Sequence, residues 1–244
     1  MFNPFNSILM NVTLTSLFAF LFHFVFLYPS HGEEDERPNI IVFLVDDYDK
    51  PETSPYGGKV LTPNLDRLVK EGMICHNAHV TSTVCTPSRY TFLTGRYASS
   101  SHSNTFLDEC PKGTQALPAF NVGLESDRMN VGRVLADAGY ATGFVGKYHV
   151  HDTDHSQEHS LFGDLDVPKN AAYTEDLNKR KFKLEKLQRE LVKKNGFTWA
   201  KNIYWGNLKQ PFKGHNPDWT AQAALEFIEE HKDQPFYLHC CSTL

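Results

Sequence analysis

A continuous apolar run near the N-terminus constrains the fold of this chain more than any other feature. Residues 38–47 read PNIIVFLVDD, a stretch rich in Ile and Val that ends in two acidic residues. An apolar run without polar alternation is typical of a strand buried on both faces, as in the centre of a parallel sheet. We therefore expect an α/β fold with a mostly parallel central sheet flanked by helices.

The rest of the chain alternates between helical and extended patterns. Helices are predicted at residues 62–72, 85–95, 130–138, 173–195 and 217–231, and strands at residues 140–150 and 235–241. This order is typical of βαβ units in a parallel sheet. The 244 residues contain no internal repeat and no low-complexity linker, which favours a single domain.

The segment 151–213 carries the weakest pattern, and we expect it to be a variable, partly helical insertion. Its helix at 173–195 is highly charged, so a position on the domain surface is expected. One apolar face of that helix is predicted from the spacing of Leu177, Phe182, Leu184, Leu187 and Leu191.

The first 32 residues contain no Asp, Glu, Lys or Arg, and residues 8–28 are mostly apolar. Small residues, Ser30 and Gly32, occupy the positions that precede a signal-peptide cleavage site. We interpret residues 1–32 as a signal peptide, so that the remainder is exported to an extracellular, periplasmic or lysosome-like compartment. The alternative is a retained membrane anchor, because the apolar run is about as long as a bilayer span.

Composition excludes some partners and cofactors. The formal charge of -5 gives no electrostatic reason to expect nucleic acid as a partner. The five cysteines include no CxxC pair, which argues against a zinc site built from thiolates. Adjacent Cys240 and Cys241 lie in an apolar run and are expected to be buried small hydrophobes.

Asp46 and Asp47 directly follow the first predicted strand. Open α/β sheets bind ligands at the carboxyl ends of their parallel strands. Two adjacent carboxylates at such a place suit a hard cation, Ca²⁺ or Mg²⁺. On the residues alone, a simple role in a turn or a helix cap stays open.

Cys85 is expected at the start of a helix, and Arg89 follows one turn later. A helix N-terminus attracts anions and lowers the pKa of a thiol, and a guanidinium one turn on could face the same anion. The pair therefore indicates either a cysteine nucleophile or an anion pocket. The alternative is an ordinary buried cysteine.

Lys147 and His149 lie near the end of the predicted strand 140–150, two residues apart and thus on one face. A lysine and a histidine there could neutralise an oxyanion and move a proton. The surrounding GFVGKY lacks the first glycine and the Ser or Thr of a phosphate-binding P-loop.

Together these motifs resemble the sulfatase family. PNIIVFLVDD, TPNLDRL, VCTPSRYTFLTGR and GYATGFVGKYH occur in the family's order, and they include its C-x-P-S-R and G-Y-x-T-x-x-x-G-K-x-H signatures. The segment NPDWTAQAALEFIEEHKDQPFYLHCC is also similar to one in arylsulfatase-like members. The resemblance implies an alkaline-phosphatase-like α/β fold, with residues 33–244 as the N-terminal part of the catalytic domain.

The resemblance implies a sulfuric ester hydrolase and gives each candidate residue a role. Cys85 would be converted during export to formylglycine (3-oxoalanine) by the formylglycine-generating enzyme, and its hydrate would be the nucleophile. Asp46, Asp47 and the modified Cys85 would hold Ca²⁺, with Mg²⁺ less favoured. Arg89 would steady the hydrate, Lys147 would bind the sulfate of the substrate ester, and His149 would take a proton from the hydrate.

Members of the family are about twice as long as this chain, and their later half supplies further ligands. We therefore expect the chain to be an incomplete, C-terminally truncated portion that is inactive or weak by itself. The alternatives are a phosphoester or phosphonate hydrolase of the same superfamily and a non-catalytic binding product. The residues do not identify the natural substrate.

Overall fold

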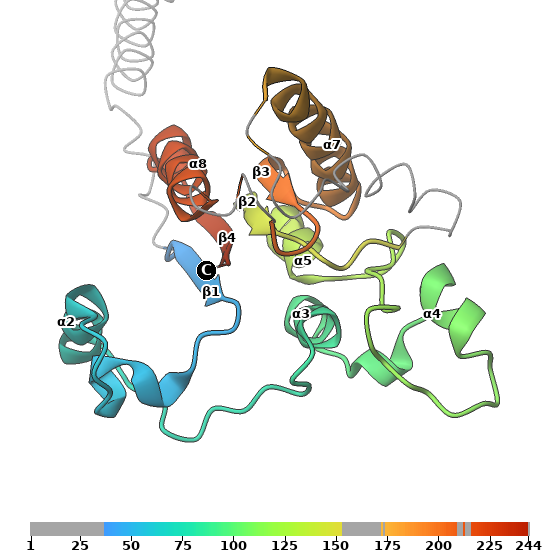
Figure 1. The fold of residues 1–244 in the computed structure, drawn as a ribbon, viewed down its shortest axis with the longest axis horizontal. Helices are drawn as coiled ribbons and strands as arrows, with labels where there is room; N and C mark the ends of the chain where they lie inside the picture. The colour runs from blue at the N-terminus through green and yellow to red at the C-terminus, as the bar shows by residue number, and fades with distance from the viewer. Residues whose placement is uncertain (1–36, 153–171, 173, 209–211, 213–215, 244) are drawn as a thin grey trace, which may run out of the picture. The chain divides into compact units, whose positions relative to one another are not determined.

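The computed structural model describes residues 37–152, 172, 174–208, 212 and 216–243. Its centre is a four-stranded sheet with the strand order β1-β4-β2-β3 (Figure 1). The strands are β1 (Ile40–Val45), β2 (Ala141–Lys147), β3 (Trp199–Tyr204) and β4 (Phe236–Ser242). All three pairings between them are parallel, which confirms the predicted α/β class with a parallel sheet. The proposed signal peptide lies outside the described residues.

Strand β4 occupies an inner position, although it comes last in the chain. It pairs with β1 on one side and with β2 on the other, and every one of its residues is buried. Cys240 and Cys241 are therefore buried, as expected, at 2% and 0% exposure.

The prediction that the first strand is central and buried on both faces is wrong for the described residues. β1 pairs only with β4 and forms an edge of the sheet. Ile40, Val42 and Leu44 pack on the larger core, whereas Ile41 and Phe43 are 53% and 63% exposed. A continuous apolar run specifies an apolar strand, but the order of strands depends on long-range pairing that the run does not encode.

Strands β3 and β2 also differ from the predicted strands. Strand β3 was not expected, yet it lies inside the segment interpreted as an insertion and pairs with β2. Strand β2 ends at Lys147, three residues before the predicted end. His149, two residues after the end of the strand, has a φ of 55°, a left-handed conformation outside the extended region.

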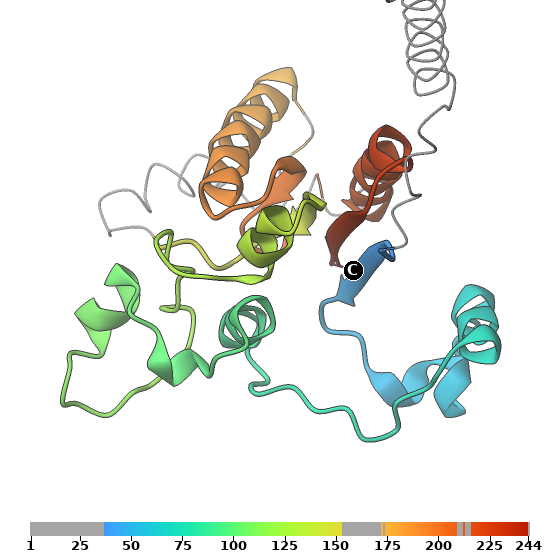
Figure 2. The same cartoon turned by 180° about the vertical axis from the view of Figure 1, so that it is seen from behind.

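The five predicted helices are present, and a sixth, α4, was not expected. The helices are α2 (Pro63–Glu71), α3 (Cys85–Thr94), α4 (Asn104–Glu109), α5 (Val131–Asp137), α7 (Glu175–Lys194) and α8 (Asn216–His231). Three short 3-10 turns, η1 (Lys50–Glu52), η2 (Ser54–Tyr56) and η3 (Ala98–Ser100), complete the described elements. Helix α8 packs on β4, β2 and β3, α7 packs on β3 and α5 on β2 (Figures 1 and 2).

The buried face of α7 differs from the one predicted. Leu177 and Leu184 are buried as expected, but Phe182 and Leu187 are 49% and 43% exposed. The buried face instead runs through Glu185, whose carboxylate is paired with Arg189 on the same helix. The charge on this face is thus compensated within the helix.

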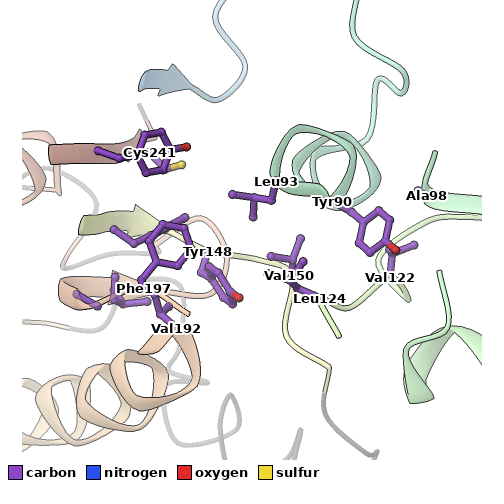
Figure 3. Close-up of a cluster of buried hydrophobic side chains, with 14 of the residues drawn as sticks. Tyr90, Leu93, Ala98, Val122, Leu124, Tyr148, Val150, Val192, Phe197 and Cys241 are labelled. Carbon is purple, nitrogen blue, oxygen red and sulfur yellow. The ribbon is translucent and has the colours of Figure 1, made fainter. Parts of the chain in front are cut away.

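Two clusters of buried apolar side chains hold the elements together. The larger one joins α3 to the segment that follows β2 and contains Tyr90, Leu93, Leu124 and Val150, each at most 2% exposed (Figure 3). The smaller one lies between α8 and the sheet and contains Val145, Ala223, Phe227, Phe236, Leu238 and Cys240. The larger cluster fixes α3 against the end of β2, where the candidate site residues lie.

None of the helices in the described part of the chain is both long and apolar enough to cross a bilayer.

Candidate active site

Helix α3 carries the first two candidate residues. It begins at Cys85, preceded by Val84 in an extended conformation, and ends at Thr94, followed by Gly95, which has a φ of 67°. Only glycine adopts that conformation readily, and the Gly95 N–H donates to the Thr91 carbonyl at 2.8 Å. Cys85 is half-buried at the first turn, where backbone N–H groups lack helical partners. The thiol is therefore placed at a helix N-terminus, as the sequence predicted.

Arg89 connects α3 to Asp46, which follows β1, and to Lys147, the last residue of β2. Its side chain is 3% exposed; one terminal nitrogen donates to the Lys147 carbonyl oxygen at 2.8 Å and the other donates to Asp46 Oδ1 at 2.6 Å. A guanidinium buried in this way is fixed in direction by its two acceptors.

Asp46 accepts from two cations. Besides the bond from Arg89, its Oδ2 atom accepts from Lys147 Nζ. The backbone N–H of Asp46 donates to the Ser242 carbonyl oxygen at 3.0 Å, which extends the pairing of β1 with β4. Burial acts to raise the pKa of Asp46, but the hydrogen bond from Lys147 and the charge of Arg89 outweigh it, and the pKa is lowered. Asp46 is thus a carboxylate held between two positive charges.

A local irregularity in β2 precedes Lys147. The pairing of β2 with β3 shifts register between Val145 and Gly146, and Gly146 has a φ of 90°. A Cβ atom at Gly146 would lie 1.9 Å from the Cys241 carbonyl oxygen, so only glycine fits there. Such bulges change the direction of the following side chain, here Lys147, which is 2% exposed.

His149 faces the nucleophile candidate. Its Nδ1 atom lies 3.1 Å from Cys85 Sγ. The imidazole stacks on Phe120 with 5.5 Å between ring centroids and meets Trp205 edge-on at 4.3 Å. Burial, followed by the charges of Lys147 and Arg89, lowers the pKa of His149 to about 3. The ring is therefore neutral near pH 7.

Asp47 differs from the other candidates. It is exposed, has a φ of 53°, and receives no hydrogen bond or ion pair from any described residue. The structure thus brings five candidates together, Asp46, Cys85, Arg89, Lys147 and His149, and places Asp47 next to them with a free carboxylate.

The donor chemistry of this site fits Ca²⁺. Asp46 and Asp47 supply hard carboxylate oxygens at the carboxyl end of β1, and each carboxylate oxygen has a second lone pair beyond any hydrogen bond it accepts. Across the described ranges no group of three or more His, Cys, Asp or Glu side chains is gathered closely enough to hold a metal. Asp46 and Asp47 are thus two carboxylates, fewer than the roughly six to eight oxygen ligands that Ca²⁺ takes.

Three further residues touch the site and were missed from the sequence. Asn207 Oδ1 accepts from Lys147 Nζ at 2.7 Å, while Trp205 and Phe120 flank His149. Trp205 and Asn207 follow β3, so recognising WAKNIYWGN as a strand with a polar residue after its end could have found them. No sequence signal points to Phe120.

Residues 38–243 match a protein-family model described as Sulfatase. The chain is 36% identical over 139 residues to human steryl-sulfatase, a match that covers 54% of this chain and 22% of the relative. It is also 36% identical over 119 residues to N-acetylglucosamine-6-O-sulfatase from Bacteroides thetaiotaomicron, covering 48% of this chain and 19% of the relative. The matched part of the chain thus spans only about a fifth of the length of these relatives.

Solved structures share the fold at lower sequence identity. One, from a study of glycosaminoglycan metabolism by Bacteroides thetaiotaomicron, superposes with a TM-score of 0.57 at 23% identity, over 85% of this chain and 51% of that one. Another, solved with its substrate D-glucosamine-2-N,6-O-disulfate, gives a TM-score of 0.50 at 21% identity, over 84% of this chain and 34% of that one.

Proposed function

Because this chain belongs to the sulfatase family, we propose that the protein hydrolyses a sulfate ester through a nucleophile derived from Cys85. The observation that carries the proposal is the 3.1 Å approach of His149 Nδ1 to Cys85 Sγ, beside the cations Arg89 and Lys147. A nucleophile, a proton acceptor and an anion site therefore lie together at one edge of the sheet.

Conversion of Cys85 to formylglycine would replace the thiol by an aldehyde. The hydrate of that aldehyde carries two hydroxyl groups where Sγ lies now. The hydrate would supply the nucleophilic hydroxyl oxygen: as it bonds to the ester sulfur, the bond from sulfur to the alcohol oxygen would break, and the alcohol would leave with the proton of that hydroxyl. Two easier steps thus replace one direct displacement by water.

Release of sulfate needs a base at the second hydroxyl. His149 is placed for this, because its Nδ1 atom contacts the atom that the hydrate would replace. His149 would take the proton of this hydroxyl as the C=O bond re-forms and the C–O bond to sulfate breaks, and would then release the proton to water. Water then rehydrates the aldehyde, so the net reaction consumes one ester and one water.

Arg89 and Lys147 supply the positive charge for the anion. Both are almost fully buried, and both bind Asp46, which holds them in place before the substrate arrives. Asp46, Asp47 and the modified residue 85 would also hold Ca²⁺. When bound, Ca²⁺ would orient the sulfate and offset its charge.

This function requires an oxidising enzyme as a partner. We propose that the formylglycine-generating enzyme acts on residue 85 during export, directed by a signal peptide at residues 1–32. The CTPSR sequence beginning at Cys85 supports this assignment. The relatives are named for different sulfate esters, so the proposal is limited to this class of substrate.

The test is hydrolysis of p-nitrophenyl sulfate and p-nitrophenyl phosphate by the full-length protein, its Cys85→Ala variant and its Cys75→Ala variant. Cys75 is a free, exposed cysteine and is not one of the candidate site residues, so it is the matched control. We expect turnover of the sulfate ester, at a low rate for this chain by itself, by the wild type and by Cys75→Ala, and none by Cys85→Ala. Equal rates in all three proteins, or a preference for the phosphate ester, would refute the proposal.

A further inference from the structure

The contact with Lys147 determines which atom of the Asn207 side-chain amide is the oxygen and which is the nitrogen. Lys147 Nζ can only donate a hydrogen bond, so the atom of Asn207 that lies 2.7 Å from it must be the oxygen, Oδ1. The amide nitrogen, with two N–H donors, consequently points to the other side. No residue in the described ranges accepts a hydrogen bond from it, and Asn207 is exposed.

The position of Asn207 in the fold supports a role at the anion site. It follows β3 by three residues, at the carboxyl edge of the parallel sheet where Asp46 and Lys147 also lie. Trp205, two residues earlier, contacts the His149 ring at 4.3 Å. The segment after β3 therefore contacts two separate members of the site.

We propose that Asn207 binds the sulfate directly, donating from its amide nitrogen while its oxygen holds Lys147. The inference rests on the proposed function for the identity of the anion. Neutral N–H donors beside a lysine suit a sulfate oxygen, because they add hydrogen bonds without adding charge. Asn207 is then a substrate-binding residue of the reaction, supplied by the segment that follows β3.

Two substitutions separate direct binding from simple support of Lys147. Asn207→Ala removes both functions. Asn207→Asp keeps an oxygen that accepts from Lys147 but replaces the donors by a second oxygen with negative charge. If Asn207 only supported Lys147, the Asp variant would bind anions better than the Ala variant. Direct binding predicts that the Asp variant is as weak as the Ala variant or weaker.

The experiment is titration of the full-length protein with inorganic sulfate, followed by calorimetry, with thermal unfolding as a check on folding. We expect the Kd to rise about 10- to 100-fold in Asn207→Ala, as for loss of hydrogen bonds to a charged group, and at least as much in Asn207→Asp. Gln234→Glu, at an exposed amide before β4, controls for the change in the net charge of the protein and should leave the Kd unchanged.

The results of the titration and of the hydrolysis assay distinguish failure of this inference from failure of the proposed function. Recovery of sulfate binding in Asn207→Asp, or an unchanged Kd in Asn207→Ala, would overturn the inference. Absence of sulfate binding by the wild-type protein would overturn it as well. Normal sulfate binding without hydrolysis of any sulfate ester would refute the proposed function alone.

Discussion

His149 Nδ1 lies 3.1 Å from Cys85 Sγ, although the two residues are 64 positions apart in the chain. Cys85 is held by α3, and His149 is held by the left-handed turn that follows β2. The larger buried cluster connects these two elements through Tyr90, Leu93 and Val150. The contact is therefore set by the core of the domain.

Loss of His149 should slow turnover without preventing the modification of Cys85. In His149→Ala we expect kcat to fall by about 10² to 10⁴, the range for removal of a general base. Steady-state kinetics with p-nitrophenyl sulfate measure this, and mass spectrometry checks residue 85. The exposed His76 provides the control variant His76→Ala. A kcat within twofold or so of the wild type would remove His149 from the mechanism.

Arg89→Ala should destabilise the fold. It leaves Asp46 without one of its two cations and the Lys147 carbonyl without its donor. Removing one partner of a buried pair costs about 3–5 kcal/mol. Urea denaturation measures the loss, and Arg67→Ala on the exposed face of α2 is the comparison. Equal midpoints for the two variants would contradict the structural role of Arg89.

Asp47→Ala should change the requirement for calcium and leave stability nearly unchanged, because Asp47 is exposed and unpaired among the described residues. We expect a higher Ca²⁺ concentration at half-maximal activity, measured by titration after treatment with a chelator. Asp49→Ala, an exposed acid two residues further on, should behave as wild type. Identical calcium curves for the two variants would exclude Asp47 as a ligand.

Acid should destabilise the protein through His239. Its side chain is 1% exposed, its Nδ1 atom lies 2.8 Å from the Tyr237 hydroxyl, and burial followed by the charge of Arg89 lowers its pKa to about 3. The ordinary pKa is 6.5, so between these values the unfolded chain binds a proton that the folded protein does not. The stabilisation is complete above pH 6.5 and is lost as the pH falls toward 3.

The difference between the wild type and a His239 variant in how stability changes with pH measures the contribution of this residue. His239 contributes about 1.4 kcal/mol per pH unit to the free energy of unfolding within that window. His239→Gln keeps a polar partner for Tyr237 but cannot be protonated, so its stability should depend less on pH. Urea denaturation at several pH values measures both slopes. Identical slopes would show that His239 does not titrate as a buried neutral group.

The site was predictable from the sequence where short motifs combine with local structure. Cys85 and Arg89 are one helical turn apart, and the Gly95 stop signal locates their helix. Lys147 is the last residue of the predicted strand that became β2, and Asp46 directly follows the apolar run of β1. Neighbouring residues fix these placements, so a local pattern was enough to predict them.

Strand order and the segment after β3 could not be predicted in the same way. In β3 the polar residues Lys201 and Asn202 interrupt the apolar pattern, which hides the strand and with it Asn207. The edge position of β1 follows from the insertion of β4, a strand nearly 200 residues later, between β1 and β2. Such pairings depend on packing across the whole domain and leave no local signal.

The most direct test of the proposed nucleophile is mass spectrometry of one tryptic peptide, residues 71–89. The protein is purified from an export host that supplies the modifying enzyme, and it is alkylated before digestion. This peptide contains both Cys75 and Cys85, so Cys75 reports that alkylation is complete. We expect one alkylated cysteine, at position 75, and an aldehyde that reacts with a hydrazide at position 85. Two alkylated cysteines and no aldehyde would contradict the proposed nucleophile.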